Sequence, residues 1–296
     1  MKSIYRNPKA KQSIQQQYVQ YLADFKTQPE REYVETRFGI THVLRTGNKN
    51  GKPLFIFQGG NCINPMTLSW FTDSFNDYNI YAPDTIGHPG FSDETRISGK
   101  DDSYALWMKD LFDFYNIENT AVLGASYGGG ILLRLAAFMP EKIACAILVH
   151  PAGIAKGPKK NMIKEILLPL LLYKTTKSSK YLKKITNAMS TNQIPDKDRE
   201  IIEMIFNNVT LEKGMPKLTT EKELMNFKSP VFVITGTHDI FFPDSKLAAP
   251  AHKLFGNLLE YKTFHTGHFP SKKELKRMNR DISCFLEKNY NTGYPL

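Results

Sequence analysis

The sequence predicts an α/β fold with a mostly parallel central sheet, helices on both faces and a helical cap insertion. Short apolar runs typical of buried strands alternate with helically spaced segments through the first half of the chain, and again after residue 230. Such alternation forms crossover units, which place parallel strands side by side. Between the two parts, about 75 residues carry only helical spacing, which is too long for a plain loop in a compact domain.

The first part of the chain contains the elements that open the sheet. A polar helix is expected over about 9–26, and two short strands flanking Gly39 predict a β-hairpin at an antiparallel edge. The hairpin and the strands after it are expected at residues 33–38, 40–45, 54–57, 79–82, 120–123 and 146–149. Helices are expected at residues 66–75, 103–115 and 127–139.

The second part closes the sheet after the helical insertion. Apolar stripes in the insertion predict helices at residues 161–173, 178–189 and 196–208. Strands are then expected at residues 231–235 and 259–264, and helices at 244–255 and 272–288. The sequence therefore divides into a core, residues 1–152 and 225–296, and a cap, residues 153–224.

Composition excludes several classes of protein. At 41% hydrophobic and 23% charged residues, the 296-residue chain is typical of a globular protein with a sizeable core. The three cysteines lie far apart and are odd in number, which argues against a disulfide framework and fits a reducing compartment. The N-terminus lacks the apolar segment of a signal peptide, and no apolar run approaches the ~20 residues of a membrane helix. A cytoplasmic location is expected.

Positive charge is concentrated in the predicted cap. The formal net charge is +10, and residues 156–184 hold nine lysines against the single acid Glu165. No recognised nucleic-acid-binding module accompanies the lysines, so nucleic acid is not an expected partner. Inside this stretch lies the apolar run 166–173. We favour a cap helix whose leucines roof a pocket while its lysines face water, with Pro169 breaking or kinking it. The alternative is a mobile lid whose basic face meets anionic lipid or an acidic partner.

The strongest motif is G-x-S-x-G, formed by Gly124, Ser126 and Gly128. A buried strand is predicted before it and a buried helix after it, which is the context that the motif requires. A serine on such a sharp, strained turn projects from the sheet, and the glycines allow neighbouring backbone to approach closely. The N-terminus of the following helix favours negative charge that develops nearby. Ser126 is therefore the candidate nucleophile.

With this motif in place, the chain resembles the α/β-hydrolase family, and more narrowly the bacterial carboxylesterases of the naproxen-esterase kind. The resemblance runs through most of the chain and is weakest in the predicted cap. It includes residues 36–43, 84–87, 104–107, the 124–128 turn, 140–142 and 149–153. These pieces are specific for the fold and the class of reaction, and they are not specific for the substrate.

The resemblance implies a triad in which the acid and the histidine follow the serine along the chain. His268 follows a predicted strand in a Gly-His pair, and we prefer it to His265 as the base. Asp239 lies three residues after Gly236, past another strand, and matches the Gly-x-x-Asp spacing of the family. We prefer Asp239 to Asp244, whose simpler role is to cap the next helix. Asp239 would hold the tautomer of His268 that faces Ser126.

The family also implies an oxyanion hole formed by two backbone amides. One belongs to the residue after the nucleophile, Tyr127, and the other to the loop after the third strand, where Gly60 is preferred and Asn61 is the alternative. Gly59 and Asn61 are expected to contact substrate. Gln58 stands where many members have a histidine that supports this loop, and glutamine can both donate and accept hydrogen bonds.

The expected function is hydrolysis of a small-molecule carboxylic ester through an acyl-enzyme on Ser126, without a metal or other cofactor. Family members that use an aspartate at this turn, the dehalogenases and epoxide hydrolases, are disfavoured by the serine. Carbon–carbon bond hydrolases and acyltransferases share the serine and stay open as alternatives. A protein of the same fold that binds a small molecule with little or no turnover is a further alternative, because fold alone does not determine function.

Overall fold

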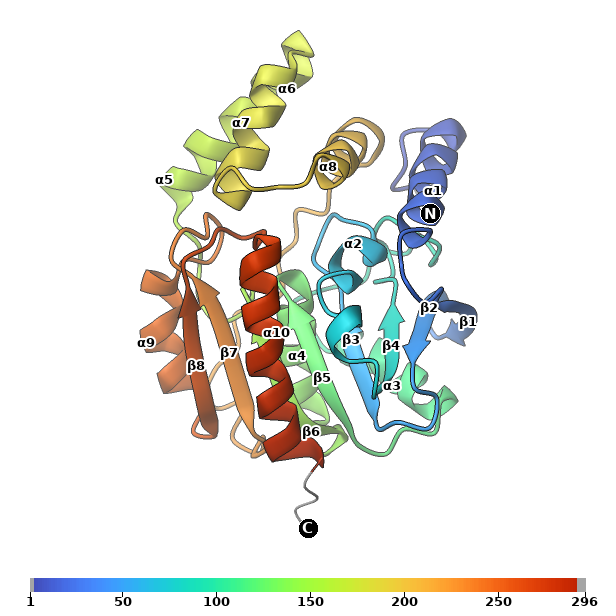
Figure 1. Ribbon diagram of the computed structural model, residues 1–296, viewed down its shortest axis with the longest axis vertical. Helices are drawn as coiled ribbons and strands as arrows, with labels where there is room; N and C mark the ends of the chain where they lie inside the picture. The colour runs from blue at the N-terminus through green and yellow to red at the C-terminus, as the bar shows by residue number, and fades with distance from the viewer. Residues whose placement is uncertain (1–2, 292–296) are drawn as a thin grey trace.

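The structure, a computed structural model, describes residues 3–291 and contains one eight-stranded sheet with helices on both faces (Figure 1). The strand order is β1-β2-β4-β3-β5-β6-β7-β8. Strand β2 pairs antiparallel with β1 and β4, and the remaining pairs are parallel. The mostly parallel sheet with an antiparallel hairpin at one edge is therefore confirmed. The strands are β1 (Glu30–Thr36), β2 (Gly39–Gly47), β3 (Pro53–Phe57), β4 (Asn79–Pro83), β5 (Thr120–Ala125), β6 (Ile143–Val149), β7 (Val231–Gly236) and β8 (Leu258–Phe264).

The helices around the sheet match the predicted segments with one exception. The expected helix 66–75 is wrong in extent, because the chain forms only the short α2 there and then the 3₁₀ turn η1 (Thr72–Ser74). A second 3₁₀ turn, η2 (Pro140–Lys142), follows α4, and a π-helical turn, η4 (Glu287–Asn291), follows α10. The helices of this group are α1 (Pro8–Leu22), α2 (Asn64–Leu68), α3 (Ser103–Phe114), α4 (Tyr127–Phe138), α9 (Asp244–Leu254) and α10 (Lys272–Leu286).

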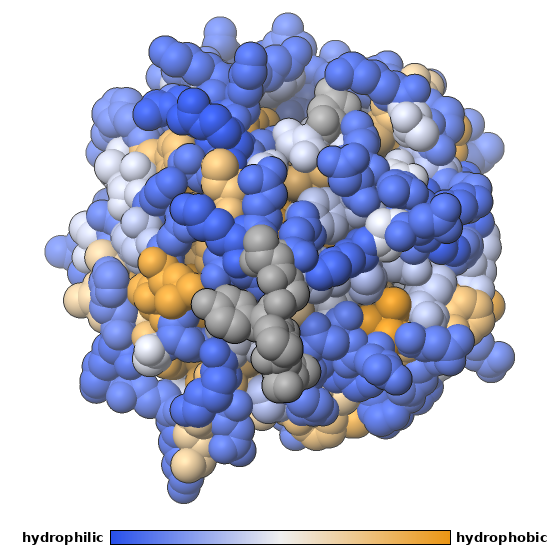
Figure 2. All heavy atoms as spheres, turned by 60° about the horizontal axis from the view of Figure 1, so that its bottom comes forward, coloured by the Kyte–Doolittle hydropathy of each residue, from blue (hydrophilic) through white to orange (hydrophobic). Residues whose placement is uncertain are grey.

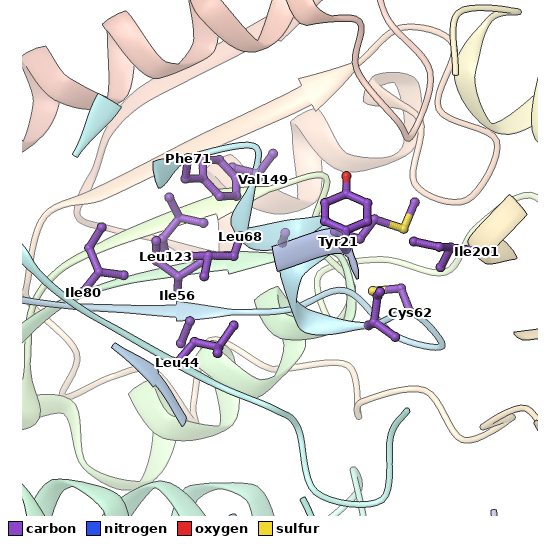
Figure 3. Packing of buried hydrophobic residues seen from close by; sticks show 14 of the residues in the cluster. Tyr21, Leu44, Ile56, Cys62, Leu68, Phe71, Ile80, Leu123, Val149 and Ile201 are labelled. Atoms are coloured by element: carbon purple, nitrogen blue, oxygen red, sulfur yellow. The ribbon is translucent and has the colours of Figure 1, made fainter. Parts of the chain in front are cut away.

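The sheet is apolar on both faces, so each face has a separate core. In β3, Leu54 and Ile56 belong to one core whereas Phe55 and Phe57 belong to the other, as the period of two of a strand requires. Helices α3, α4 and α9 cover one face, and α1, α2 and α10 cover the other. In Figure 1, α10 lies in front of the sheet and α4 behind it. Figure 3 shows part of the core beneath α2, with Tyr21 of α1 and Cys62 at one end.

The segment between β6 and β7 is helical, as its spacing predicted, and lies above the end of the sheet where the parallel strands finish (Figure 1). Its elements are α5 (Lys159–Met162), the π-helical turn η3 (Ile163–Leu167), α6 (Leu168–Thr176), α7 (Ser179–Ser190) and α8 (Asp196–Asn208). Pro169 does not break the helix. It is the second residue of α6, so its missing N–H falls directly after the π-helical turn, where the regular helical pairing already changes.

The two halves of this segment are held differently. Helix α8 is fastened to α1, because Tyr21 Oη donates to Asp198 Oδ1 at 2.8 Å. The segments next to the two helices are also joined, since the Thr210 amide after α8 donates to the carbonyl of Ile4 before α1 at 2.7 Å. Residues 159–190, which we call the projecting hairpin, consist of α5, η3, α6 and α7 and extend away from the sheet (Figure 1). None of the helices in residues 3–291 combines the length and the apolar character needed to cross a membrane.

Candidate active site

Ser126 lies on a sharp turn between β5 and α4 with a backbone φ of 51°. A residue other than glycine is strained in this left-handed region and persists there only if its surroundings hold it. Three backbone hydrogen bonds do so. The Ser126 amide donates to the Val149 carbonyl at 2.9 Å, and the Ser126 carbonyl accepts from the amides of Gly129 at 3.0 Å and Ala152 at 2.9 Å. The serine is thereby fixed at the carboxyl end of the central strand.

The glycines on either side of the serine make this turn sterically feasible. A side-chain carbon at Gly124 would lie 2.5 Å from the carbonyl oxygen of Gly128. One at Gly128 would lie 2.5 Å from the carbonyl oxygen of Phe57, at the end of β3. Both distances are far shorter than carbon–oxygen contacts tolerate. The motif is therefore required by the packing of the turn against its neighbours.

The structure brings the three predicted triad residues together. His268 Nε2 lies 2.9 Å from Ser126 Oγ, and His268 Nδ1 lies 2.8 Å from Asp239 Oδ2. Because an ionised carboxylate only accepts hydrogen bonds, Nδ1 carries the proton and Nε2 can accept the proton of the serine. Ser126 follows β5, Asp239 follows β7 and His268 follows β8, so the site lies at the carboxyl edge of the sheet.

The loop that carries His268 is attached to the projecting hairpin. The amide of Phe269 donates to the carbonyl of Met189, in the last turn of α7, at 2.9 Å. A side-chain carbon at Gly267 would lie 2.6 Å from the same oxygen, so only glycine permits this approach. The histidine therefore depends for its position on a residue of the helical segment as well as on the sheet.

The competing residues lie elsewhere. His265 is exposed and its ring contacts that of His238 with centroids 4.4 Å apart. Asp244 Oδ1 accepts from the hydroxyls of Thr235, Thr263 and Tyr261, each at 2.8 Å. The expected capping role of Asp244 is wrong in detail, because Pro243 is the N-cap and Asp244 is the first residue of α9. Neither residue hydrogen-bonds to Ser126 or His268.

Asp239 is almost fully buried and accepts four hydrogen bonds. Its Oδ1 accepts from the amides of Phe241 and Phe242 at 2.8 and 2.9 Å, and its Oδ2 accepts from His268 and His150. Burial alone would raise the pKa of this carboxyl, but the adjacent imidazoles and their hydrogen bonds hold the pKa well below its usual value. Asp239 therefore stays ionised.

His150 is the neighbour that sequence reasoning missed, since it belongs to no histidine motif. It follows β6 directly with a φ of 50°, and its Nδ1 lies 2.9 Å from Asp239 Oδ2. Burial lowers the pKa of His150, so the ring is neutral and donates through Nδ1, while its buried Nε2 has no partner among the described residues. The available signal was topological, because the residues after adjacent parallel strands β6 and β7 lie close together.

Among the described side chains, His150, Asp239 and His268 also form the one group whose ligand atoms, all within 4.8 Å of one another, could hold a metal ion. Both imidazoles already direct Nδ1 at the same carboxylate oxygen, and His268 Nε2 meets Ser126 Oγ. A metal ion would have to displace the two shared protons and break this chain of hydrogen bonds. The arrangement is therefore better suited to moving a proton from Ser126 than to binding a cation.

Two backbone amides next to Ser126 lack a partner. The structure gives no acceptor within residues 3–291 for the amides of Gly60 and Tyr127. The loop lies beside the nucleophile, since a side-chain carbon at Gly59 would be 3.8 Å from Ser126 Cβ and one at Gly60 would be 3.0 Å from Tyr127 Cβ. The amide of Asn61, the alternative donor, already donates to His88 Nδ1 at 3.3 Å. This pattern favours the Gly60 and Tyr127 amides as the oxyanion donors.

Side chains on both sides hold the loop of residues 58–62, which carries the Gly60 amide and which we call the oxyanion loop. Gln58 is buried and donates through Nε2 to the Cys62 carbonyl at 3.0 Å, while its Oε1 accepts from the Thr85 amide at 3.3 Å. The side-chain amide of Asn61 exchanges two hydrogen bonds with the backbone of Glu212, at 3.0 and 2.7 Å. Gln58 thus provides the support expected of it. The contacts of Gly59 and Asn61 with substrate stay predictions.

Two other ionisable residues near the oxyanion loop, Cys62 and His88, are uncharged at neutral pH. Burial raises the pKa of the Cys62 thiol to about 12, so it carries almost no thiolate at neutral pH. Burial also lowers the pKa of His88 to about 3, and the ring is neutral. Neither residue is therefore an alternative to Ser126 as the candidate nucleophile.

Comparisons with known proteins show that the chain is similar to hydrolases. The model of a family described as "Serine aminopeptidase, S33" matches residues 72–267. The carboxylesterase YbfK of Bacillus subtilis is 26% identical over 92% of this chain and 92% of its own length. A crystal structure of a putative hydrolase from Bacillus subtilis superimposes with a TM-score of 0.83 at 21% identity, covering 95% of this chain and all of the other. The naproxen esterase of Bacillus subtilis superimposes with a TM-score of 0.78 at 22% identity, covering 92% and 96%.

Proposed function

Because the chain belongs to the hydrolase family described as serine aminopeptidase, S33, we propose that it is a serine hydrolase that cleaves carboxylic esters through an acyl-enzyme on Ser126. The observation that carries the proposal is the unbroken chain of hydrogen bonds from Ser126 Oγ through His268 to Asp239, with links of 2.9 and 2.8 Å. The choice of esters over peptides rests on the carboxylesterase relatives.

In the first half of the reaction, His268 Nε2 removes the proton of Ser126 as Oγ attacks the ester carbonyl. Asp239 stays ionised and stabilises the resulting imidazolium through Nδ1–H. The carbonyl oxygen gains negative charge and accepts hydrogen bonds from the amides of Gly60 and Tyr127, at the N-terminus of α4, where the helix dipole adds to the stabilisation. His268 then returns the proton to the leaving alcohol, and the acyl group stays on Ser126.

In the second half, water takes the place of the alcohol. His268 removes a proton from the water, which attacks the acyl carbonyl, and the same two amides hold the oxyanion. Collapse of this intermediate releases the carboxylic acid and returns the proton to Ser126. Every group needed for both halves is supplied by the chain.

The alternatives are less well supported. A protein that only binds a small molecule has no use for a strained serine aligned with a histidine and an ionised aspartate, and strain at such a site indicates function. Carbon–carbon bond hydrolases and acyltransferases use the same groups. The two relatives that match over 92% and 94% of this chain are carboxylesterases, however. The small-molecule substrate is accordingly proposed to be an ester.

The test is active-site labelling combined with a substrate series. A fluorophosphonate probe is expected to label Ser126, and Ser126→Ala to lose both labelling and hydrolysis of p-nitrophenyl esters of increasing acyl length. Ser98→Ala, which changes an exposed serine away from the triad, is the control and keeps both. A label mapped by mass spectrometry to Cys62 or to another serine contradicts the assignment. Cleavage of aminoacyl p-nitroanilides without ester cleavage keeps Ser126 but replaces esters by peptides as the substrate.

A further inference from the structure

The projecting hairpin exposes apolar side chains on its outer surface. Ile163, Leu167, Leu168 and Leu171, which we call the outer stripe, are 55, 52, 51 and 59% exposed. Three of them are spaced four residues apart and therefore share one face of the helix. The opposite side, with Ile166, Pro169 and Tyr173, is buried. The expectation that the leucines of residues 166–173 cover the pocket is therefore wrong for Leu167, Leu168 and Leu171, which are exposed.

Such clustering is unusual on this protein. Other exposed large apolar residues, such as Val19, Phe114 and Leu259, belong to separate elements. Figure 2 shows the molecule from its opposite end, where hydrophobic residues form small separate patches among hydrophilic ones. Isolated exposed apolar residues are normal, whereas grouped ones indicate an interaction surface.

Lysines surround the outer stripe. Lys160, Lys164 and Lys174 lie three residues from Ile163, Leu167 and Leu171 respectively, and so lie next to them on the helix surface. All nine lysines of residues 156–184 are exposed. The single acid of the stretch, Glu165, is already engaged by Lys164 at 3.4 Å and Lys184 at 3.6 Å. Among the side chains that the structure describes, the other seven lysines of this stretch have no acidic partner.

The hairpin also contains a hollow suited to an anionic group. It has a volume of about 450 Å³, is open to solvent, and lies where Glu165 meets α7. Its lining includes Lys180, Lys183, Lys184 and Asn187, together with Glu165, whose carboxylate pairs with Lys184 at 3.6 Å. The lysines and the asparagine are hydrogen-bond donors of the kind that phosphate oxygens accept.

We propose that the projecting hairpin docks on the surface of an anionic lipid bilayer. An amphipathic helix with lysines beside leucines lies in the plane of such a surface, with the leucines at the boundary of headgroups and acyl chains and the lysines against phosphate and carboxylate groups. The hollow can take a lipid headgroup. Because α8 is fastened to α1, the hairpin can engage the surface while the other half of the segment stays on the core.

Charge argues against the other ways to cover the outer stripe. In a two-fold contact with a second copy the same patch meets itself, and this would bring two sets of unpaired lysines together. An acidic protein could neutralise the lysines, but it would need an apolar groove matching the leucines as well. An anionic bilayer has negatively charged headgroups directly above an apolar interior, so one surface can contact both the lysines and the leucines.

The test is sedimentation of the full chain with vesicles. Vesicles of equimolar phosphatidylserine and phosphatidylcholine are compared with phosphatidylcholine alone, at low and at physiological ionic strength. We expect binding to the anionic vesicles that weakens as salt rises, because surface charge is screened, and none to the neutral vesicles. Polyglutamate in place of vesicles tests for an acidic protein partner.

Two matched pairs of variants separate the contributions. Leu171→Asn should weaken binding several-fold, whereas Leu259→Asn, which changes an equally exposed leucine on β8, should not. Replacing Lys160, Lys164 and Lys174 by glutamine should weaken it by about tenfold or more, whereas replacing Lys9, Lys246 and Lys276 removes the same charge and should have little effect. Equal thermal unfolding temperatures within each pair show that the fold is intact.

Three results would overturn the proposal. The first is no sedimentation with anionic vesicles at low salt. The second is an equal loss of binding in the control variants, which would mean that net charge alone is responsible. The third is binding to polyglutamate that leaves the vesicles unbound. None of these measurements depends on hydrolysis, so they are independent of the proposed function.

Discussion

His150 and His268 both donate through Nδ1 to the same oxygen, Oδ2 of Asp239, at 2.9 and 2.8 Å. The carboxylate therefore faces two imidazoles on one oxygen and two backbone amides on the other. Such a carboxylate cannot rotate without losing several charge-assisted hydrogen bonds at once. The orientation of His268 toward Ser126 is fixed by this arrangement.

His150 is expected to position Asp239. His150→Gly removes the donor without straining the left-handed backbone, and we expect kcat for ester hydrolysis to fall by about tenfold or more, because a hydrogen bond to a charged group contributes about 1.5–3 kcal/mol. His150→Asn keeps an N–H donor and tolerates the same φ, so it should retain most of the activity. Steady-state kinetics of both variants checks this. Equal loss in the two would show that the hydrogen bond is irrelevant.

Asp239→Asn is expected to lower kcat by up to about 10⁴-fold while the protein stays folded, because the tautomer of His268 is no longer held. Asp244→Asn should be mild, since Asp244 bonds only to hydroxyls of β7 and β8. Kinetics with a chromogenic ester, beside circular dichroism, distinguishes the two. A crippling Asp244→Asn with a mild Asp239→Asn would exchange their roles.

His268→Ala should abolish ester hydrolysis, and His265→Ala should leave it within a factor of about two, since exposed substitutions away from the site have small effects. The reason is geometric, because only His268 contacts Ser126 Oγ. The rate of fluorophosphonate labelling gives a second readout that does not need substrate. Rapid labelling of the His268→Ala protein would argue against its role as base.

Gln58→Glu is expected to destabilise the protein by about 1–3 kcal/mol, because the group that donates to the Cys62 carbonyl becomes an acceptor and leaves it unpaired in a buried site. Gln20→Glu makes the same change on the exposed face of α1 and serves as the control. Denaturant unfolding measures both. A stability loss no larger than that of the control would mean that Gln58 does not support the loop.

His88 predicts a dependence of stability on pH. Burial lowers its pKa to about 3 in the folded protein, whereas an unfolded histidine titrates near 6.5. Between these values only the unfolded chain binds the proton, so the free energy of unfolding decreases by about 1.4 kcal/mol for each unit by which the pH is lowered. His88→Gln should remove this part of the slope, while exposed His252→Gln should follow the wild type. Identical slopes for all three proteins would refute the interpretation.

The fold and the proximity of Ser126, His268 and Asp239 could be predicted because they depend on local signals. The strand-turn-helix context singles out Ser126, and Gly236 and Gly267 mark the spacing of Asp239 and His268. His150 could not be found this way, because its contact with Asp239 arises from the pairing of β6 with β7. The exposure of Leu167 and Leu171 could not be predicted either. Apolar residues lie on two sides of this helix, and the sequence does not say which side packs against the rest of the protein.

The bond from the Phe269 amide to the Met189 carbonyl makes that amide an internal reporter. An amide exchanges its hydrogen with solvent only when its hydrogen bond opens, so deuterium uptake at this position follows the separation of α7 from the histidine loop. Whatever draws the projecting hairpin away from the core pulls on the residue next to His268. Exchange at Phe269, measured by mass spectrometry, therefore reads out movement of the helical segment at the place where it would disturb the proton transfer.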